Sequence, residues 1–435
     1  LAGDYELSEQ ITVVVGANLT VIGGHTGVGN ERGAGASVVK PAEGVRTRLF
    51  NAEGTAASPI TVAFDGVTLT GGSMPSGVSQ YGMAIYAKNA VLTFAGCVLE
   101  GNGGEFSDNG NNGYSRFGGA VYLESGTFTA TGTTFRRNYI KSNTPGSGTS
   151  AYGGALYLKS ATVALTNDVF EGNYLLIQHF YANGGAIDLE SCPSAEIVSC
   201  TFTSNHVQWA ESYGNDRVYG GTLYASGCAS LLVEDCAFTG SWINSYHDTL
   251  GTSMTFGHGG TMFLAGGSQN ATIRRTAIQN CGYRAAAANY DSGAVTLAGG
   301  TLTMENVLIG HIHGNCFEMR GGTANVRRCT FAGAEESRGA QGYGFYHATG
   351  GTVASFTESI LSGNAKGGYL ANSVSPATFA YCCLQDGAEG LGNFSDDPLF
   401  ADATYFHVKS QAGRYDGGWF AGGAWVTDDE TSKTL

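Results

Sequence analysis

The sequence predicts an all-β protein, a right-handed parallel β-helix of about 12 to 13 coils with long loops on one side. Composition and two alternating motifs lead to this prediction. The 435 residues include 68 Gly and only 7 Pro, with 42% apolar and 13% charged residues. Such a chain is too apolar to be disordered. At this length we expect several domains or a repeat, and the composition favours the repeat.

The first motif is Gly-Gly followed by a small residue, an aliphatic residue, an outward residue and Leu. Clear copies begin at Gly118, Gly153 and Gly184, and weaker copies begin at Gly220, Gly259 and Ser292. Between the motifs the polarity alternates with period 2, which indicates strands and not helices.

The second motif is an apolar residue, two spacers and Asn, as in Phe135 and Asn138. Its apolar position recurs every 23 to 40 residues, at Leu69, Leu99, Phe135, Phe170, Phe202, Phe238, Ile278, Leu308, Phe331, Leu361 and Leu384. The shortest step fits one turn of three short strands, and we expect the longer steps to add loop. Asn tolerates the left-handed conformation at a corner, and its amide can bond the same Asn one coil away.

The alternation of Gly-Gly-Ala-[Ile/Leu/Val] with Phe-x-x-Asn, over about residues 60–385, resembles the repeats of chlamydial polymorphic outer-membrane proteins. More broadly it resembles the pectin-lyase-like β-helix superfamily. The resemblance implies a surface-exposed or secreted β-helix, often adhesive, and implies no particular activity. The segment Asp397-Pro398-Leu399-Phe400, with residues 406–410, resembles the ending of secreted bacterial β-helix proteins.

We therefore expect a β-helix over residues 1–390 and a capping tail over residues 391–435. The abrupt first and last residues suggest a fragment of a longer surface protein. The net charge of −14 argues against nucleic acid or an anionic membrane as partner. No apolar run reaches the ~18 residues that a membrane helix needs. The expected location is outside the cell, secreted or on the cell surface.

The sequence contains ten cysteines, and their spacing bears on whether they form disulfides. Five of them, Cys97, Cys200, Cys236, Cys329 and Cys382, lie two residues before the apolar column. Cys192 and Cys228 each follow a Gly-Gly pair by seven residues. Neighbouring coils are ~4.8 Å apart, so disulfides Cys200–Cys236 or Cys192–Cys228 and stacked buried thiols are both compatible with the spacing. Zinc is not expected, because no pair of Cys-x-x-Cys units occurs.

The outward position of the first motif predicts one aromatic and acidic column along the axis. Its members are Tyr86, Tyr122, Tyr157, Asp188, Tyr224, Phe263, Thr296, Glu318 and His347. Rings that stack on one another would stabilise the wall. The functional alternative is a carbohydrate platform in which Tyr122, Tyr157 and Tyr224 stack on sugar faces.

Asp188 and Glu190, two apart on a strand and near Lys159, are the candidate catalytic residues. Carboxylates at ~6 to 7 Å would suit an inverting hydrolase, or Ca²⁺ if loops supplied more oxygens. Lys159 could instead pair with Glu124 and Glu190. No recognised catalytic motif occurs, so the balance is against an enzyme.

Two predicted loops carry paired aromatic residues, Trp209 with Tyr213 and Trp242 with Tyr246. Loops on a rigid scaffold are common binding sites, although these rings could simply cover the wall. A weaker metal hypothesis places His311 and His313 beside Glu318 and His347.

Three functions remain open from the sequence. The first is an adhesin, or a module that binds glycan or another molecule of a host or neighbouring cell surface. The second is a polysaccharide lyase or glycoside hydrolase that uses Asp188 and Glu190, although fold alone does not establish activity. The third is a structural spacer or filament subunit that associates end to end. No cofactor is expected apart from the Ca²⁺ alternative.

Overall fold

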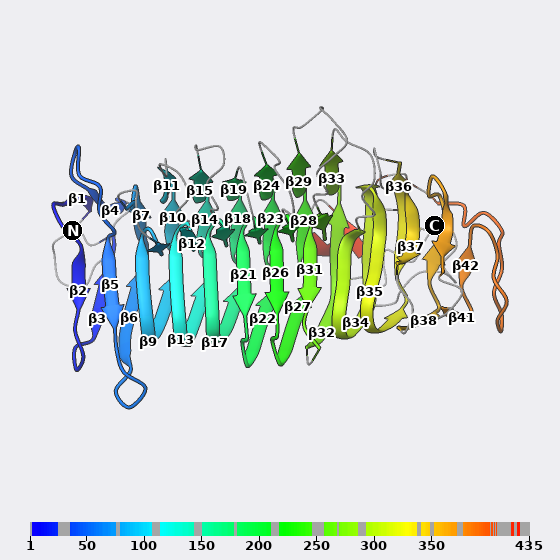
Figure 1. Ribbon diagram of the computed structural model, residues 1–435, viewed down its shortest axis with the longest axis horizontal. Helices are drawn as coiled ribbons and strands as arrows, with labels where there is room; N and C mark the ends of the chain where they lie inside the picture. The colour runs from blue at the N-terminus through cyan, green and yellow to red at the C-terminus, as the bar shows by residue number, and fades with distance from the viewer. Residues whose placement is uncertain are drawn as a thin grey trace.

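The computed structural model describes residues 2–24, 35–74, 79–106, 114–142, 150–177, 181–209, 217–245, 256–267, 269–285, 293–336, 341–348, 352–371, 377–400, 402, 404, 406, 419–421 and 424–426. These residues build a parallel β-helix whose coils stack along one long axis (Figure 1). The predicted fold class is confirmed. Within the described residues there is no helix long and apolar enough to cross a membrane.

Each coil contributes strands to three main stacks. The first stack follows the Gly-Gly corner and has twelve members: β2 (Ile11–Val13), β5 (Phe50–Glu53), β9 (Ile85–Ala95), β13 (Val121–Thr131), β17 (Leu156–Thr166), β21 (Ile187–Glu190), β26 (Leu223–Ser226), β31 (Met262–Ala265), β34 (Gly293–His313), β35 (Asn315–Arg327), β37 (Tyr343–His347) and β40 (Gly367–Leu370). The second stack also has twelve: β3 (Leu19–Ile22), β6 (Ile60–Asp65), the second halves of β9, β13 and β17, β22 (Ser194–Val198), β27 (Ser230–Glu234), β32 (Asn270–Gln279), later parts of β34 and β35, β38 (Val353–Thr357) and β41 (Thr378–Ala380).

The third stack has thirteen members, so the expected 12 to 13 coils are present. They are β1 (Gly3–Leu7), β4 (Ser37–Pro41), β7 (Val67–Thr70), β10 (Val98–Glu100), β14 (Thr134–Arg136), β18 (Val169–Glu171), β23 (Thr201–Thr203), β28 (Ala237–Thr239), the ends of β32 and β34, β36 (Thr330–Glu335), β39 (Ile360–Leu361) and β42 (Cys383–Leu384).

Part of what the sequence predicted as loop is strand. A fourth stack follows the Asn corners: β11 (Gly103–Phe106), β15 (Tyr139–Ser142), β19 (Tyr174–Ile177), β24 (His206–Trp209), β29 (Trp242–Ser245) and β33 (Gly282–Ala285). A separate parallel sheet, the second sheet, precedes the Gly-Gly corners: β8 (Gln80–Tyr81), β12 (Ser115–Phe117), β16 (Ser150–Tyr152), β20 (Tyr181–Asn183), β25 (Arg217–Tyr219) and β30 (Phe256–His258). A small antiparallel hairpin, β43 (Trp419–Ala421) and β44 (Ala424–Val426), lies near the C-terminus.

The main core lies inside the coils and is built from apolar columns. The rings of Phe135, Phe170, Phe202 and Phe238 stack with centroid distances of 4.7, 4.9 and 4.3 Å. A smaller core joins the fourth stack to the second sheet, where residues such as Ile140 and Ala151 are fully buried. The second sheet is thus held by apolar contacts and is part of the folded wall.

The Asn corners form the predicted ladder of amides. Asn138 Nδ2 donates to Asn173 Oδ1 at 3.0 Å, and Asn173 Nδ2 donates to Asn205 Oδ1 at 2.9 Å. The left-handed residue, however, is the one before each Asn, as at Arg137 with φ 53°. Asn is therefore required here for its side-chain hydrogen bonds and not for its backbone conformation.

Two register predictions were wrong by one residue. The buried member of the apolar column is Ile309, which pairs with Ile278 and Phe331, and Leu308 points out of the main core. Asn306 takes the left-handed corner with φ 53°, so the strand resumes one residue later than the motif suggested. On the first stack, Glu318 pairs with Tyr346 and not with His347.

The described part of the tail lies against the coils. Phe394 forms a parallel bridge with Cys383 of the last coil. Phe406 packs on His311 with a ring centroid distance of 4.9 Å, and Gln279 Nε2 donates to the carbonyl of Thr404. The described residues between 391 and 406 therefore return along the wall after the last coil.

Candidate functional site

The Gly-Gly corners bring the second sheet onto the outer face of the first stack. In the copy at Gly153 and Gly154, Gly153 has φ +66°, and a Cβ on Gly154 would lie 2.0 Å from the carbonyl oxygen of Gly185. Only glycine fits such a corner, since it takes a left-handed φ and lets adjacent backbones approach closely. Each member of the outward column is therefore faced by the residue five positions before it in the sequence. Tyr152, for example, faces Tyr157.

Aromatic rings from the two sheets interlock in the resulting layer. On the wall, Tyr86 and Tyr122, and Tyr122 and Tyr157, stack at 5.3 Å. On the second sheet, Phe117 stacks on Tyr81 at 5.1 Å and on Tyr152 at 4.9 Å. Edge contacts join the two ladders. We call these two interlocking ladders of rings the aromatic layer.

The predicted outward column is therefore buried, and the exposed carbohydrate platform is not formed by it. Tyr122 is 6% exposed and Tyr157 is 3% exposed, although Tyr224 is half-buried. An aromatic residue directly before most of the Gly-Gly pairs, as in Tyr152-Gly153 and Tyr219-Gly220, is the sequence signal that could have revealed the covering sheet. The stacking interpretation of the column is the one that the geometry supports.

Both ladders are interrupted at the same coil. Asp188 pairs in register with Tyr157 and Tyr224, so a carboxylate replaces a ring on the wall. Asn183 pairs in register with Tyr152 and Tyr219, so an amide replaces a ring on the second sheet. Burial raises the pKa of Asp188 well above its usual value, and the charge of Glu190 adds to this effect.

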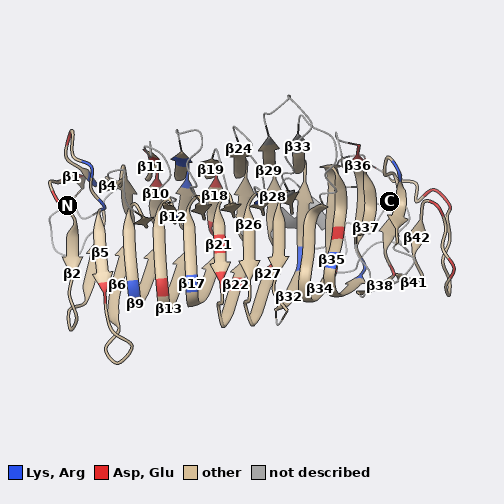
Figure 2. Cartoon of the chain, in the orientation of Figure 1, with Lys and Arg blue, Asp and Glu red and all other residues tan. Residues whose placement is uncertain are grey.

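The candidate catalytic pair is divided between two environments. Asp188 is 1% exposed beneath the second sheet, whereas Glu190 lies at the edge of the aromatic layer with a side chain 39% exposed. Glu190 accepts a hydrogen bond from the hydroxyl of Tyr157 and pairs with Lys159 at 3.3 Å. Glu124 pairs with Lys88 at 3.2 Å in the same alternating row of charges (Figure 2). Glu190 is thus accessible from solvent, whereas Asp188 is covered by the second sheet.

A pocket of about 300 Å³ lies at β30, the last strand of the second sheet. Its lining consists of Arg217, Tyr219, His258, Phe263, Ala298 and Arg320. The wall ladder ends here because Phe263 is followed in register by Thr296 and not by another ring. The loss of a ring opens space between the two sheets, and three basic side chains line it. The sequence analysis did not identify this pocket.

A buried carboxylate organises the base of the pocket. Glu318 is fully buried, accepts from Thr296 Oγ1 at 2.9 Å and from Arg320 Nε at 2.5 Å, and lies 3.5 Å from His258 Nδ1. Burial raises the pKa of Glu318, but the hydrogen bond and charge of His258, with Arg320, outweigh it and hold the pKa below its ordinary value. Glu318 thus stays ionised and orients Arg320 and His258 toward the pocket.

The predicted aromatic loop residues are placed differently. Trp242 begins β29 and continues a half-buried outer ladder, in register with Tyr139, Tyr174 and His206. Its ring centroid lies 5.1 Å from that of His313. Gly282 lies between these two residues in the ladder and has no side chain to separate their rings. Trp209 ends β24 and is not in a loop. Tyr213 and Tyr246 lie outside the described residues.

The histidines of the metal hypothesis are not brought together. His311 packs on Phe406, His313 lies 3.4 Å from Glu335, and His347 bonds Thr352. Across the described ranges no group of three or more His, Cys, Asp or Glu side chains is arranged to hold a metal ion.

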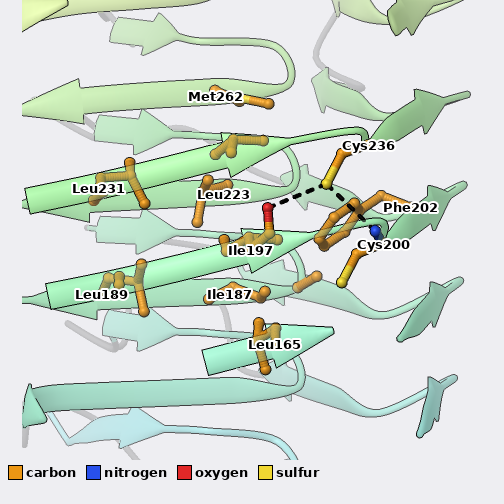
Figure 3. Close-up of a cluster of buried hydrophobic side chains, with 14 of the residues drawn as sticks. Leu165, Ile187, Leu189, Ile197, Cys200, Phe202, Leu223, Leu231, Cys236 and Met262 are labelled. Atoms are coloured by element: carbon orange, nitrogen blue, oxygen red, sulfur yellow. Dashed lines mark hydrogen bonds between the residues drawn. The ribbon is translucent and has the colours of Figure 1, made fainter. Parts of the chain in front are cut away.

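The ten cysteines are buried, and the structure holds each as a free thiol. The predicted disulfides Cys200–Cys236 and Cys192–Cys228 are therefore not formed in it. Cys236 Sγ accepts from the backbone N–H of Cys200 at 3.4 Å and contacts the carbonyl of Ile197, as Figure 3 shows. Three coils away at the same corner, Thr133 Oγ1 accepts from Cys97 N, and Asp168 Oδ1 accepts from Thr133 N. Cys, Thr and Asp thus serve one corner role.

Comparison with known families supports the fold. A family model described as a right-handed β-helix region matches residues 186–384. Searches of curated proteins and of solved structures gave no match. The chain is thus a right-handed parallel β-helix protein, and the finer resemblance to pectin-lyase-like and chlamydial repeats stays a prediction.

Proposed function

We propose that this β-helix is a secreted or cell-surface module that binds acidic carbohydrate, with the pocket at the end of the second sheet as its binding site. The observation that carries the proposal is the gathering of Arg217, His258 and Arg320 beside two rings, in a protein of net charge −14. Guanidinium groups bind carboxylate and sulfate in a bidentate manner.

The charge of the pocket favours an anionic ligand. Glu318 offsets one of the two guanidinium charges, so the site keeps a net positive charge before any proton on His258. Arg217 is exposed, while Tyr219 and Phe263 form an apolar side on which a sugar ring can rest. Small-molecule sites combine apolar walls with a few converging polar groups in this way.

The test is a glycan array that includes uronic-acid, sulfated and neutral glycans, with and without Ca²⁺, followed by a reducing-end assay on any glycan bound. We expect binding of acidic glycans only, without cleavage. Arg217→Gln should weaken binding, whereas Arg327→Gln, an exposed arginine that pairs with Glu358, serves as the matched control. Binding of neutral glycans alone, or cleavage of the bound glycan, would overturn the proposal.

A further inference from the structure

The coil that carries Asn183 and Asp188 interrupts an otherwise continuous layer of rings. Tyr152 and Tyr157 stand on one side of the break with ring centroids 6.2 Å apart. Tyr219 and Tyr224 stand on the other side, also 6.2 Å apart. Two short polar side chains thus occupy the places that aromatic rings take in neighbouring coils.

Both short side chains present an unsatisfied oxygen to this break. Asp188 is 1% exposed and Asn183 is 8% exposed. Asp188 Oδ2 and Asn183 Oδ1 have no hydrogen-bond partner among the described residues. A buried oxygen without a partner costs ~1 to 3 kcal/mol, and more when it is charged. Both oxygens belong to the coil in which the two ladders are interrupted, and a positively polarised group near them would remove this cost.

The surrounding charges indicate what this group is. Glu190 is already neutralised by Lys159 at 3.3 Å and bonded by Tyr157. When Asp188 is ionised, it has no ion pair among the described residues, and a single positive charge would balance it. The faces of aromatic rings also attract cations.

We propose that Asp188 Oδ2 and Asn183 Oδ1 form a buried site for a monovalent metal cation, Na⁺ or K⁺, enclosed by the rings of the aromatic layer. Ca²⁺ fits less well because its second charge would have no counterpart at this site. The cation would complete the aromatic layer at the coil where the rings are missing and so stabilise the attachment of the second sheet.

The test measures the thermal midpoint of the protein in NaCl, KCl and N-methylglucamine chloride at equal ionic strength. A mildly alkaline buffer is used because a proton competes least for a carboxylate there. The titratable groups that interact with Asp188 are Tyr152, Tyr157, Tyr224, Glu190, Cys192 and Cys228. Burial raises the pKa of each of these tyrosines, so they remain neutral in that buffer.

We expect the midpoint to rise by a few degrees in NaCl or KCl relative to N-methylglucamine chloride. Asp188→Asn, which keeps the shape and removes the charge, should abolish the difference. Asp168→Asn is the matched control, because Asp168 is equally buried but accepts backbone N–H bonds at both oxygens, and it should retain the difference. Equal midpoints in all three salts for the unmodified protein, or a cation effect that persists in Asp188→Asn, would overturn the proposal. A larger effect of CaCl₂ that also depends on Asp188 would replace the monovalent ion by Ca²⁺ and overturn it as stated.

Discussion

The ring of Phe117 stands edge-on to the ring of Tyr157 at a centroid distance of 4.8 Å, with 62° between the ring planes. This contact joins a strand of the second sheet to the wall of the β-helix. The same contact repeats along the axis, as between Tyr81 and Tyr122 at 5.0 Å. The second sheet is therefore attached by a regular aromatic layer, and the pocket opens where that layer ends.

Removing a central ring of this layer should destabilise the protein. We expect Tyr157→Ala to lower the free energy of unfolding by about 3 kcal/mol, since it leaves a cavity beside the rings of Tyr122 and Phe117. Urea unfolding followed by far-UV circular dichroism measures the change. Tyr381→Ala, at a ring 56% exposed, should cost less than about 0.5 kcal/mol. Equal effects of the two substitutions would show that the aromatic layer contributes little.

Removing an amide from the Asn ladder should also destabilise the protein. Asn173 Nδ2 donates to Asn205 Oδ1 and to the carbonyl of Phe135, and its Oδ1 accepts from Asn138. We expect Asn173→Ala to cost about 3 kcal/mol or more, because it leaves several buried polar groups without partners. Asn270→Ala, at an exposed amide with one long hydrogen bond, is the control and should be nearly neutral. A cost below about 1 kcal/mol at Asn173 would mean that water replaces the ladder.

Asp168 should make the stability depend on pH. Burial raises the pKa of Asp168 to about 7 from 3.8, although the N–H groups of Thr133 and Thr166 act in the opposite direction. The folded protein therefore binds this proton more tightly than the unfolded chain. The ionised carboxyl costs stability, and the cost grows as the pH rises from about 4 to about 7.

Asp168→Thr, which introduces the residue that the preceding coil has at this corner, Thr133, tests this prediction. Relative to Asp168→Thr, the unmodified protein should lose about 2 to 4 kcal/mol of unfolding free energy across that pH range. Parallel pH profiles of the two proteins would contradict the raised pKa.

The cysteines should behave as protected thiols. Burial raises the pKa of Cys329 to about 12 and also raises that of Cys97. We expect no reaction of the native protein with a thiol reagent, and titration of all ten thiols in denaturant without reductant. Dithiothreitol should leave the thermal midpoint unchanged. A count of eight or fewer thiols would instead reveal the disulfides that the sequence allowed.

The fold could be predicted from sequence because its strongest signals are local and repeated. Gly-Gly corners and Phe-x-x-Asn corners recur once per coil, and the stacked Phe and Asn residues lie where the motifs placed them. The column of Tyr122 and Tyr157 was also assigned to the correct face of its strands. Periodicity, however, shows only that a side chain points out of the coil, and not whether another sheet covers it.

The site could not be predicted because it depends on contacts between strands of different coils. Strands β16 and β25 contain three residues each, too few to show a period. Arg217, His258 and Arg320 come from three separate strands, and their meeting depends on the register of the second sheet against the wall. Glu318 was predicted as a member of the column and of the metal hypothesis, but nothing local marks it as the partner of His258.

The most direct test of the acidic-carbohydrate proposal is calorimetric titration of the best acidic glycan from the array into the unmodified protein and Arg217→Gln. We predict affinity about tenfold weaker in the variant, unchanged unfolding, and binding that weakens as salt is raised. Unchanged affinity in Arg217→Gln, with binding lost in Trp242→Ala, would contradict the account and move the site to the outer ladder.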